Sequence, residues 1–221
     1  MNGMLGEIKY LLLKDLSLEL KLKHTLGSII LFAFSTIFIC YLGFLNIVDQ
    51  FTWNALFWII ILFAATNSIS RSFTQEGEPR FLYYYFIVRP QSVILAKSIY
   101  NSIVTLLIAL LSFGLYLTVM GNPVDNIYLF LSALVLGVIG FSLPMTMVAA
   151  IASKAGNNPV MMSILSFPIV IPVIINCIKI SKIAIDGLDV SFSFDEIAVL
   201  LAIDIIVVTL SVILFPYLWK N

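Results

Sequence analysis

Six long apolar runs determine what this chain can fold into. They cover residues 25–47, 52–70, 98–120, 127–152, 159–178 and 197–219. A helix of about 20 apolar residues crosses the hydrocarbon core of a bilayer and satisfies its own backbone polar groups there. Too little polar surface is left for a water-soluble globule, because 61% of the residues are hydrophobic and 11% are charged. The sequence therefore predicts an all-α polytopic membrane protein with six transmembrane helices in a single domain over residues 1–221.

Lysine and arginine gather at one set of span ends, which predicts the orientation. This set comprises Lys9, Lys14, Lys21, Lys23, Arg71, Arg80, Arg89, Lys97, Lys154 and Lys220. The opposite ends carry only Lys179 and Lys182. Because such residues are enriched on the cytoplasmic side, we expect both termini in the cytoplasm. Trp53 and Trp219 fall where aromatic belts at the membrane interfaces are expected.

The first 24 residues predict an amphipathic helix that is too charged to span. Its apolar residues lie mostly on one helical stripe: Ile8, Leu11, Leu12, Leu16, Leu18 and Leu22. We expect this helix to lie in the cytoplasmic interface, with its lysines near anionic lipid head groups. The alternative is a leader that only sets topology.

The longest cytoplasmic loop, residues 71–97, contains helix signals of its own. Gly77 and Glu78 before Pro79 suit a helix start, and Pro90 supplies a stop. The segment between them, RFLYYYFIVR, combines aromatic residues with arginines, as the cores of protein interfaces do. The residues alone leave open whether this segment packs at the membrane or docks a partner.

Prolines lie inside the fourth and fifth predicted spans. Pro168 and Pro172 lie four residues apart in the fifth span, and Pro144 lies in the fourth. Each proline removes a backbone hydrogen bond and favours a kink or local unwinding. These prolines mark candidates for a moving or substrate-lining element, although proline is also common in membrane helices without such a role.

Asp204 is the only acidic residue well inside a span. An intramembrane carboxylate is a functional candidate, but here it could also snorkel to water or accept a hydrogen bond from a neighbouring helix. Asn67, Asn101 and Asn176 could supply hydrogen bonds between helices.

Sequence motifs of known enzymes are missing. No GxxxxGK[ST], GxGxxG, HExxH, GxSxG or CxxCH pattern occurs, and His24 is the sole histidine. We therefore expect no catalytic residue and no metal site in this chain. The zero net charge offers no basic surface for nucleic acid.

In its layout and in four short motifs the chain resembles the membrane subunits of ABC-2 type transporters. Within that group it is similar to the CcmB family, the haem exporter membrane subunits of cytochrome c maturation. The motifs are KDLSLELK at 14–21, QEGE at 75–78, RP at 89–90 with ILAK at 94–97, and SILSFPIVIP at 163–172.

The resemblance implies a permease without its own nucleotide site in the bacterial inner membrane, paired with a CcmA-like cytoplasmic ATPase. It also implies CcmC-, CcmD- and CcmE-like haem-handling partners, two copies per complex, and haem as possible cargo. The loop becomes a cytoplasmic coupling helix between spans two and three. Its docking residues are Phe73, Gln75, Glu76, Gly77, Glu78, Arg80, Arg89 and Pro90.

Two alternatives stay open, of which the second comes from a different class of transport. An ABC-2 permease for a lipid, polysaccharide or drug would share the same loop. A self-contained secondary transporter would need a polar site at mid-membrane near broken helices. Only Asp204 and the prolines of the fifth span favour this alternative.

Overall fold

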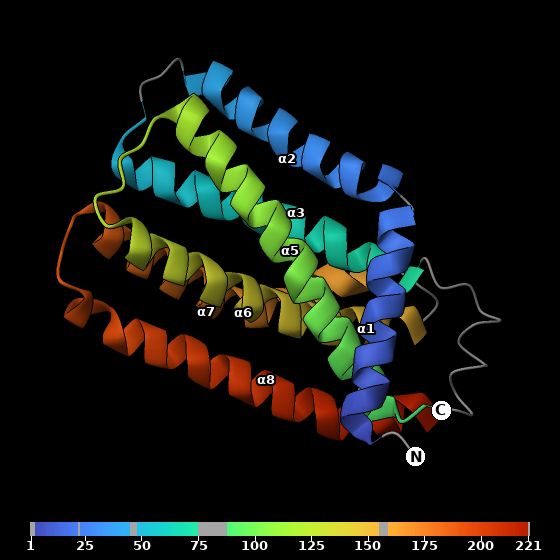
Figure 1. The fold of residues 1–221 in the computed structure, drawn as a ribbon. Helices are drawn as coiled ribbons and strands as arrows, with labels where there is room; N and C mark the ends of the chain where they lie inside the picture. Colours follow the sequence, from blue (N-terminus) through green and yellow to red (C-terminus); the bar gives the residue numbers. More distant parts are fainter. Residues whose placement is uncertain (1–2, 22, 45–47, 75–87, 155–158, 221) are drawn as a thin grey trace.

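A computed structural model describes residues 3–21, 23–44, 48–74, 88–154 and 159–220. Within these ranges the chain is almost entirely helical (Figure 1). The helices are α1 (Met4–Lys21), α2 (Lys23–Phe44), α3 (Gln50–Thr74), α5 (Pro90–Met120), α6 (Ile127–Lys154), α7 (Pro159–Ile185), the short 3₁₀ helix η1 (Val190–Ser193) and α8 (Phe194–Lys220). Six of them, α2, α3, α5, α6, α7 and α8, are long and apolar enough to cross a membrane, which confirms the six predicted spans.

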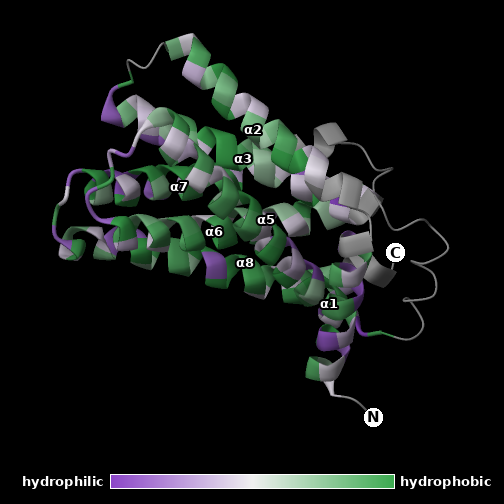
Figure 2. Ribbon diagram, turned by 45° about the horizontal axis from the view of Figure 1, so that its top comes forward, coloured by the Kyte–Doolittle hydropathy of each residue, from purple (hydrophilic) through white to green (hydrophobic). Residues whose placement is uncertain are grey.

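The helix α1 lies crosswise over one end of the bundle (Figure 1). It contacts α5 and α2 there. The connections from α5 to α6 and from α7 to α8 lie at the opposite end (Figure 1). Hydrophilic residues concentrate at the two ends, and the lengths of the spans are hydrophobic (Figure 2). This distribution is the one expected of helices surrounded by lipid.

The helix α6 lies at the centre of the bundle, in contact with α3, α5, α7 and α8. Two glycines allow this close packing. A Cβ atom at Gly137 would lie 2.6 Å from Cys177 Sγ and 2.8 Å from the Trp58 ring, and one at Gly140 would lie 2.8 Å from Val173 Cγ1. Real Cβ atoms do not approach other atoms so closely. The helices α3 and α7 can therefore pack this close to α6 only because α6 has glycine at these two positions.

An aromatic cluster fills the bundle near the start of α3. The Trp53 ring lies 4.7 Å from that of Tyr116 and 6.0 Å from that of Phe130, and Phe57 packs against all three. The Tyr116 hydroxyl also donates a hydrogen bond of 3.0 Å to the Trp53 carbonyl oxygen. The expected place of Trp53 in an interfacial belt is therefore wrong, because its ring is buried in the protein and only 2% exposed.

Asp49 caps the N-terminus of α3. Its carboxylate accepts hydrogen bonds from the hydroxyl and the backbone N–H of Thr52. These bonds lower the pKa of Asp49, the hydroxyl bond contributing most, because they stabilise the charged form. This capping fixes where the second span begins.

Candidate functional site

Where α1 packs on α5 beside the end of α3, the contacts of a buried ion pair join the three helices. Lys97 Nζ of α5 lies 3.4 Å from Asp15 Oδ2 of α1. The same ammonium donates a hydrogen bond of 3.1 Å to the Ser72 carbonyl oxygen in the last turn of α3. Lys97 and Asp15 are each only 6% exposed. A buried pair of charges is tolerated when its remaining donors and acceptors are satisfied, and Ser72 supplies one such acceptor.

Asn101, one turn further along α5, extends these contacts to α6. Its amide Nδ2 donates to Ser72 Oγ at 3.2 Å and to Thr146 Oγ1 of α6 at 2.9 Å. Asn101 is 1% exposed and Thr146 is fully buried. We call Asp15, Lys97, Ser72, Asn101 and Thr146 the buried polar chain; it links α1, α5, α3 and α6. The prediction that Asn101 bonds between helices is confirmed.

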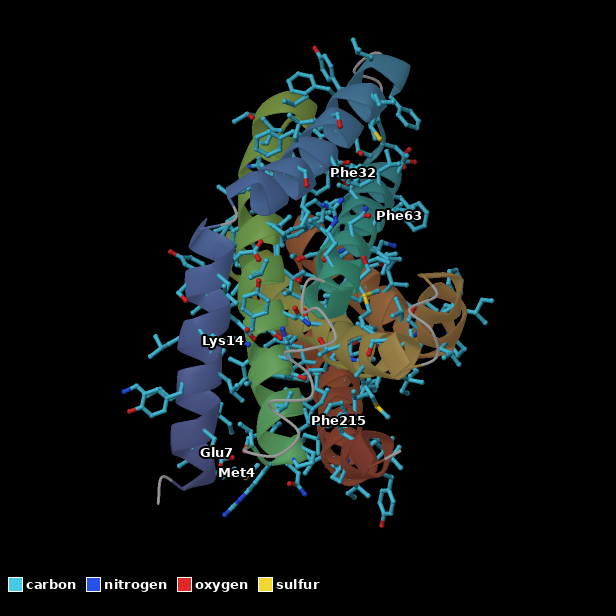
Figure 3. All side chains as sticks on the ribbon, turned by 90° about the vertical axis from the view of Figure 1, so that its right-hand side faces the viewer. Met4, Glu7, Lys14, Phe32, Phe63 and Phe215 are labelled. Atoms are coloured by element: carbon cyan, nitrogen blue, oxygen red, sulfur yellow. The ribbon has the colours of Figure 1, made fainter. Side chains whose placement is uncertain are left out.

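Two further carboxylates of α1 face α5. Glu7 Oε2 accepts a hydrogen bond of 2.6 Å from Ser92 Oγ, and Arg89 Nε lies 4.0 Å from Glu7 Oε1. Glu19 Oε2 accepts one of 2.7 Å from the Tyr100 hydroxyl. Figure 3, in which Glu7 and Lys14 are labelled, shows α1 lying along the first part of α5. The helix α1 therefore binds the bundle through an acidic stripe.

The chemistry of helix ends explains why a lysine contacts Ser72. The last carbonyl groups of a helix have no intrahelical partner and carry partial negative charge. The Lys97 ammonium supplies both a donor and a positive charge at the end of α3.

A small cavity beside the contact of Lys97 with Ser72 has a volume of about 10 Å³, which is room for one water molecule. It is lined by Glu19, Ile29, Ser68, Arg71, Ser72, Tyr100 and Val104.

The predicted docking residues fall around the connection between α3 and α5. Phe73 belongs to the last turn of α3, whereas Gln75, Glu76, Gly77, Glu78 and Arg80 lie outside the described residues. The predicted coupling helix lies there too, so docking stays a prediction. Arg89 is the N-cap of α5 and Pro90 its first residue.

Pro90 is the first residue of α5, a position at which a proline loses no hydrogen bond. The third span is consequently longer than its apolar run, which begins at residue 98, and α1 packs on the added turns. Whether Pro90 also ends a helix in the loop stays a prediction, because residues 75–87 lie outside the described residues.

The proline-containing spans are continuous helices. Pro144 is buried within α6, while Pro168 is exposed and Pro172 half-buried within α7. No unwound segment interrupts either helix between its first and last residue. Whether these prolines mark a moving or substrate-lining element stays a prediction.

Asp204 lies inside the bundle, where α8 meets α6. It is 7% exposed, and within the described ranges its buried Oδ1 has no hydrogen-bond partner. A Cβ atom at Gly140 would lie 3.4 Å from this oxygen. The described parts of the chain contain no group of three or more His, Cys, Asp or Glu residues placed to hold a metal ion.

Sequence reasoning missed most of the buried polar chain. Lys97 was interpreted as an orientation signal and as part of the ILAK motif, and of the charges in α1 only the lysines were placed, near lipid head groups. A usable signal was present, because Glu7, Leu11, Asp15 and Glu19 recur every four residues and therefore share one helical face.

The six span-length helices define the class of protein as a multi-pass α-helical membrane protein. Residues 7–217 match the family model described as CcmB protein, so the chain belongs to the CcmB family. Membership confirms the resemblance seen in the sequence and implies a permease subunit of an ABC transporter of the cytochrome c maturation system. No curated protein matches the chain.

Proposed function

We propose that this chain is a single-domain permease subunit in the bacterial inner membrane that couples ATP hydrolysis by a separate subunit to haem handling. The coupled step is release of a haem-loaded chaperone or export of haem, in support of c-type cytochrome assembly. The observation that carries the proposal is the CcmB family match over residues 7–217, which includes all six spans.

The ATPase docks at the connection between α3 and α5. The proposed contact residues are Phe73, Gln75, Glu76, Gly77, Glu78, Arg80, Arg89 and Pro90. Support comes from the two ends of this connection, which are attached to the bundle. Ser72 accepts from Lys97 just before it, and Ser92 bonds Glu7 just after it. A force applied to a loop moves the spans only if the loop ends are held, and these contacts hold them.

Both termini and this connection lie on the cytoplasmic side. The count of lysines and arginines supports this orientation. The positions of α1, the end of α3 and the end of α8 at the same end of the bundle support placing them on one side of the membrane (Figure 1). In this orientation α1 lies along the cytoplasmic leaflet.

The partners are a CcmA-like ATPase, CcmC-, CcmD- and CcmE-like proteins and membrane lipids, with two permease copies per complex. Pro144, Pro168 and Pro172 are candidates for a translocation path in α6 and α7. We assign this chain no cofactor of its own, since ATP binds the partner subunit and haem enters only as a possible cargo.

One observation favours a second candidate function, ion-coupled transport without an ATPase. The buried Asp204 with its unpartnered Oδ1 is the kind of group that such a transporter uses. An ABC-2 permease for another substrate shares every feature of the docking site and differs only in partners and cargo.

Affinity purification of the tagged chain from its native host in mild detergent tests the proposal. We expect an ATPase subunit and haem-handling proteins to co-purify, and Glu76→Ala with Glu78→Ala to weaken ATPase recovery. Asp189→Ala is the matched control, because Asp189 is exposed at the other end of the bundle. Recovery of the chain alone, with no ATP hydrolysis, would contradict the proposal and turn attention to Asp204.

A further inference from the structure

In the described residues, both ends of the connection between α3 and α5 are attached to the rest of the protein by side-chain contacts. On the α3 side, Ser72 offers its carbonyl oxygen to Lys97 and its hydroxyl to Asn101. On the α5 side, Ser92 and Arg89 both approach Glu7 of α1. Both ends of the connection therefore have contacts that reach α1.

Lys97 of α5 contacts both α3 and α1 and so connects the two sets of contacts. Its ammonium touches the end of α3 and the Asp15 carboxylate of α1, and it lies 5.7 Å from the centre of the Tyr100 ring. From Ser72 the contacts continue through Asn101 to Thr146, whose hydroxyl donates to the Ser142 carbonyl oxygen within α6. Every member of the buried polar chain is at most 8% exposed, so water does not readily replace these bonds.

We propose that Lys97 is a positioning residue for coupling: it joins the end of α3 to α1 and, through Ser72 and Asn101, to the central helix α6. A displacement of the α3–α5 connection then moves α1 and α6 together. The inference rests on the proposed function, because the displacement comes from the docked ATPase. It goes beyond that function by naming the side chain that transmits a displacement of the α3–α5 connection to α1 and α6.

The buried charge of Lys97 explains why its contact with Ser72 can transmit a movement of α3. If α3 moved away from Lys97 alone, the ammonium would lose an acceptor inside the protein, which is costly. Movement of α3 together with α5 and α1 keeps all its contacts. The three helices are thus expected to move as one body, while the Arg89–Glu7 pair, in which Arg89 is exposed, can open at less cost.

The test uses the complete complex with Lys97→Met, which keeps the length of the side chain and removes the charge. Three quantities are measured: recovery of the ATPase subunit, ATP hydrolysis per complex, and c-type cytochrome formed in a host lacking its own copy. We expect recovery and hydrolysis to stay within about twofold of the unmodified complex, and cytochrome formed per ATP hydrolysed to fall by about 2- to 30-fold, the range of coupling effects along packed networks.

Two matched variants separate coupling from folding. Lys97→Arg keeps a positive charge between Asp15 and Ser72 and should restore most of the cytochrome yield. Lys14→Met removes the other cation beside Asp15, at 2.9 Å, which is not a member of the buried polar chain, and should leave the yield unchanged. An assembled Lys97→Met complex with an unaltered yield per ATP would overturn the inference and leave the proposed function intact. Absence of an ATPase from the unmodified complex would instead overturn the proposed function.

A second measurement needs no variant. Amide hydrogen exchange of the unmodified complex is followed with and without a trapped nucleotide. We expect protection of residues 4–21 to change together with that of residues 66–74 and 88–101. A nucleotide-dependent change in 66–74 with none in α1 would overturn the inference, even if Lys97→Met did not accumulate.

Discussion

The Tyr100 hydroxyl of α5 donates a hydrogen bond of 2.7 Å to the Glu19 carboxylate of α1, and both residues are buried. With Glu7 and Asp15, Glu19 completes an acidic stripe that faces α5 along α1. The opposite side of α1 leaves Leu5, Tyr10 and Leu13 exposed. The helix therefore turns carboxylates as well as Leu11 toward the protein and leaves several apolar side chains uncovered, unlike a soluble amphipathic helix, whose uncovered face is polar.

Removal of the Tyr100 hydroxyl should loosen this contact. Tyr100→Phe leaves the Glu19 carboxylate buried without its donor, and hydrogen bonds to charged groups contribute about 1.5–3 kcal/mol to stability. We expect a loss of this order in the free energy of unfolding, measured by detergent denaturation of the purified protein. Tyr10→Phe on the exposed side of α1 is the control and should change little. Equal stability of the two variants would show that the Tyr100 bond is not maintained.

The glycines of α6 give a second prediction. Gly137→Ala places a methyl group where Cys177 Sγ and the Trp58 ring lie, and overpacking of this kind costs about 1–3 kcal/mol. Gly114→Ala in α5 is the matched control, because a Cβ atom there meets nothing within 4 Å. That variant should gain about 0.5–1 kcal/mol, since alanine is the better helix former. Thermal unfolding would contradict this packing account if Gly137→Ala were as stable as the native protein.

Asp204 separates the two candidate functions. Under the proposed function, Asp204→Asn should leave c-type cytochrome formation within about twofold of normal. Asp204→Leu should unfold at the same or a higher temperature, because removing a buried polar group that lacks a partner is neutral or stabilising. Loss of all activity in a stable Asp204→Asn protein would instead indicate ion-coupled transport.

The cap of α3 predicts a pH dependence. The pKa of Asp49 is lowered by its bonds to Thr52, so the folded state favours the charged carboxylate. Its contribution to stability is present above the ordinary pKa of 3.8 and is lost as the pH falls through the lowered value. Asp49→Ala should therefore unfold at a lower temperature than the native protein at pH 6. This difference should shrink below pH 3, whereas a difference independent of pH would contradict the assigned cap.

The spans were predictable because lipid imposes a simple rule on length and polarity. The residues at which the helices begin and end were harder to predict. The apolar run that ends at residue 178 gave no sign that α7 continues to Ile185, where Ser181 accepts a hydrogen bond of 2.9 Å from Trp58 Nε1 of α3. Likewise α5 begins at Pro90 because α1 covers its first turns, a tertiary contact that hydropathy does not encode.

The candidate site was predictable only in part for the same reason. Asn101 was identified, since an amide inside a span requires partners. Lys97 and Asp15 were not paired, because each is a common residue at a membrane surface and their contact depends on how α1 crosses α5. The loop residues 75–80 were selected through the family resemblance and lie outside the described residues, so their docking role stays a prediction.

The central claim is that an ATPase docks on the connection between α3 and α5. A photo-crosslinking amino acid placed at Gln75 or Glu78, in the membranes of the native host, tests it most directly, with the same group at Tyr128 as the control. Tyr128 is 84% exposed and is the second residue of α6, which begins at the opposite end of the bundle (Figure 1). We predict an adduct with the ATPase subunit from Gln75 or Glu78 and none from Tyr128. An ATPase adduct from Tyr128 alone, or from none of these positions, would contradict the account.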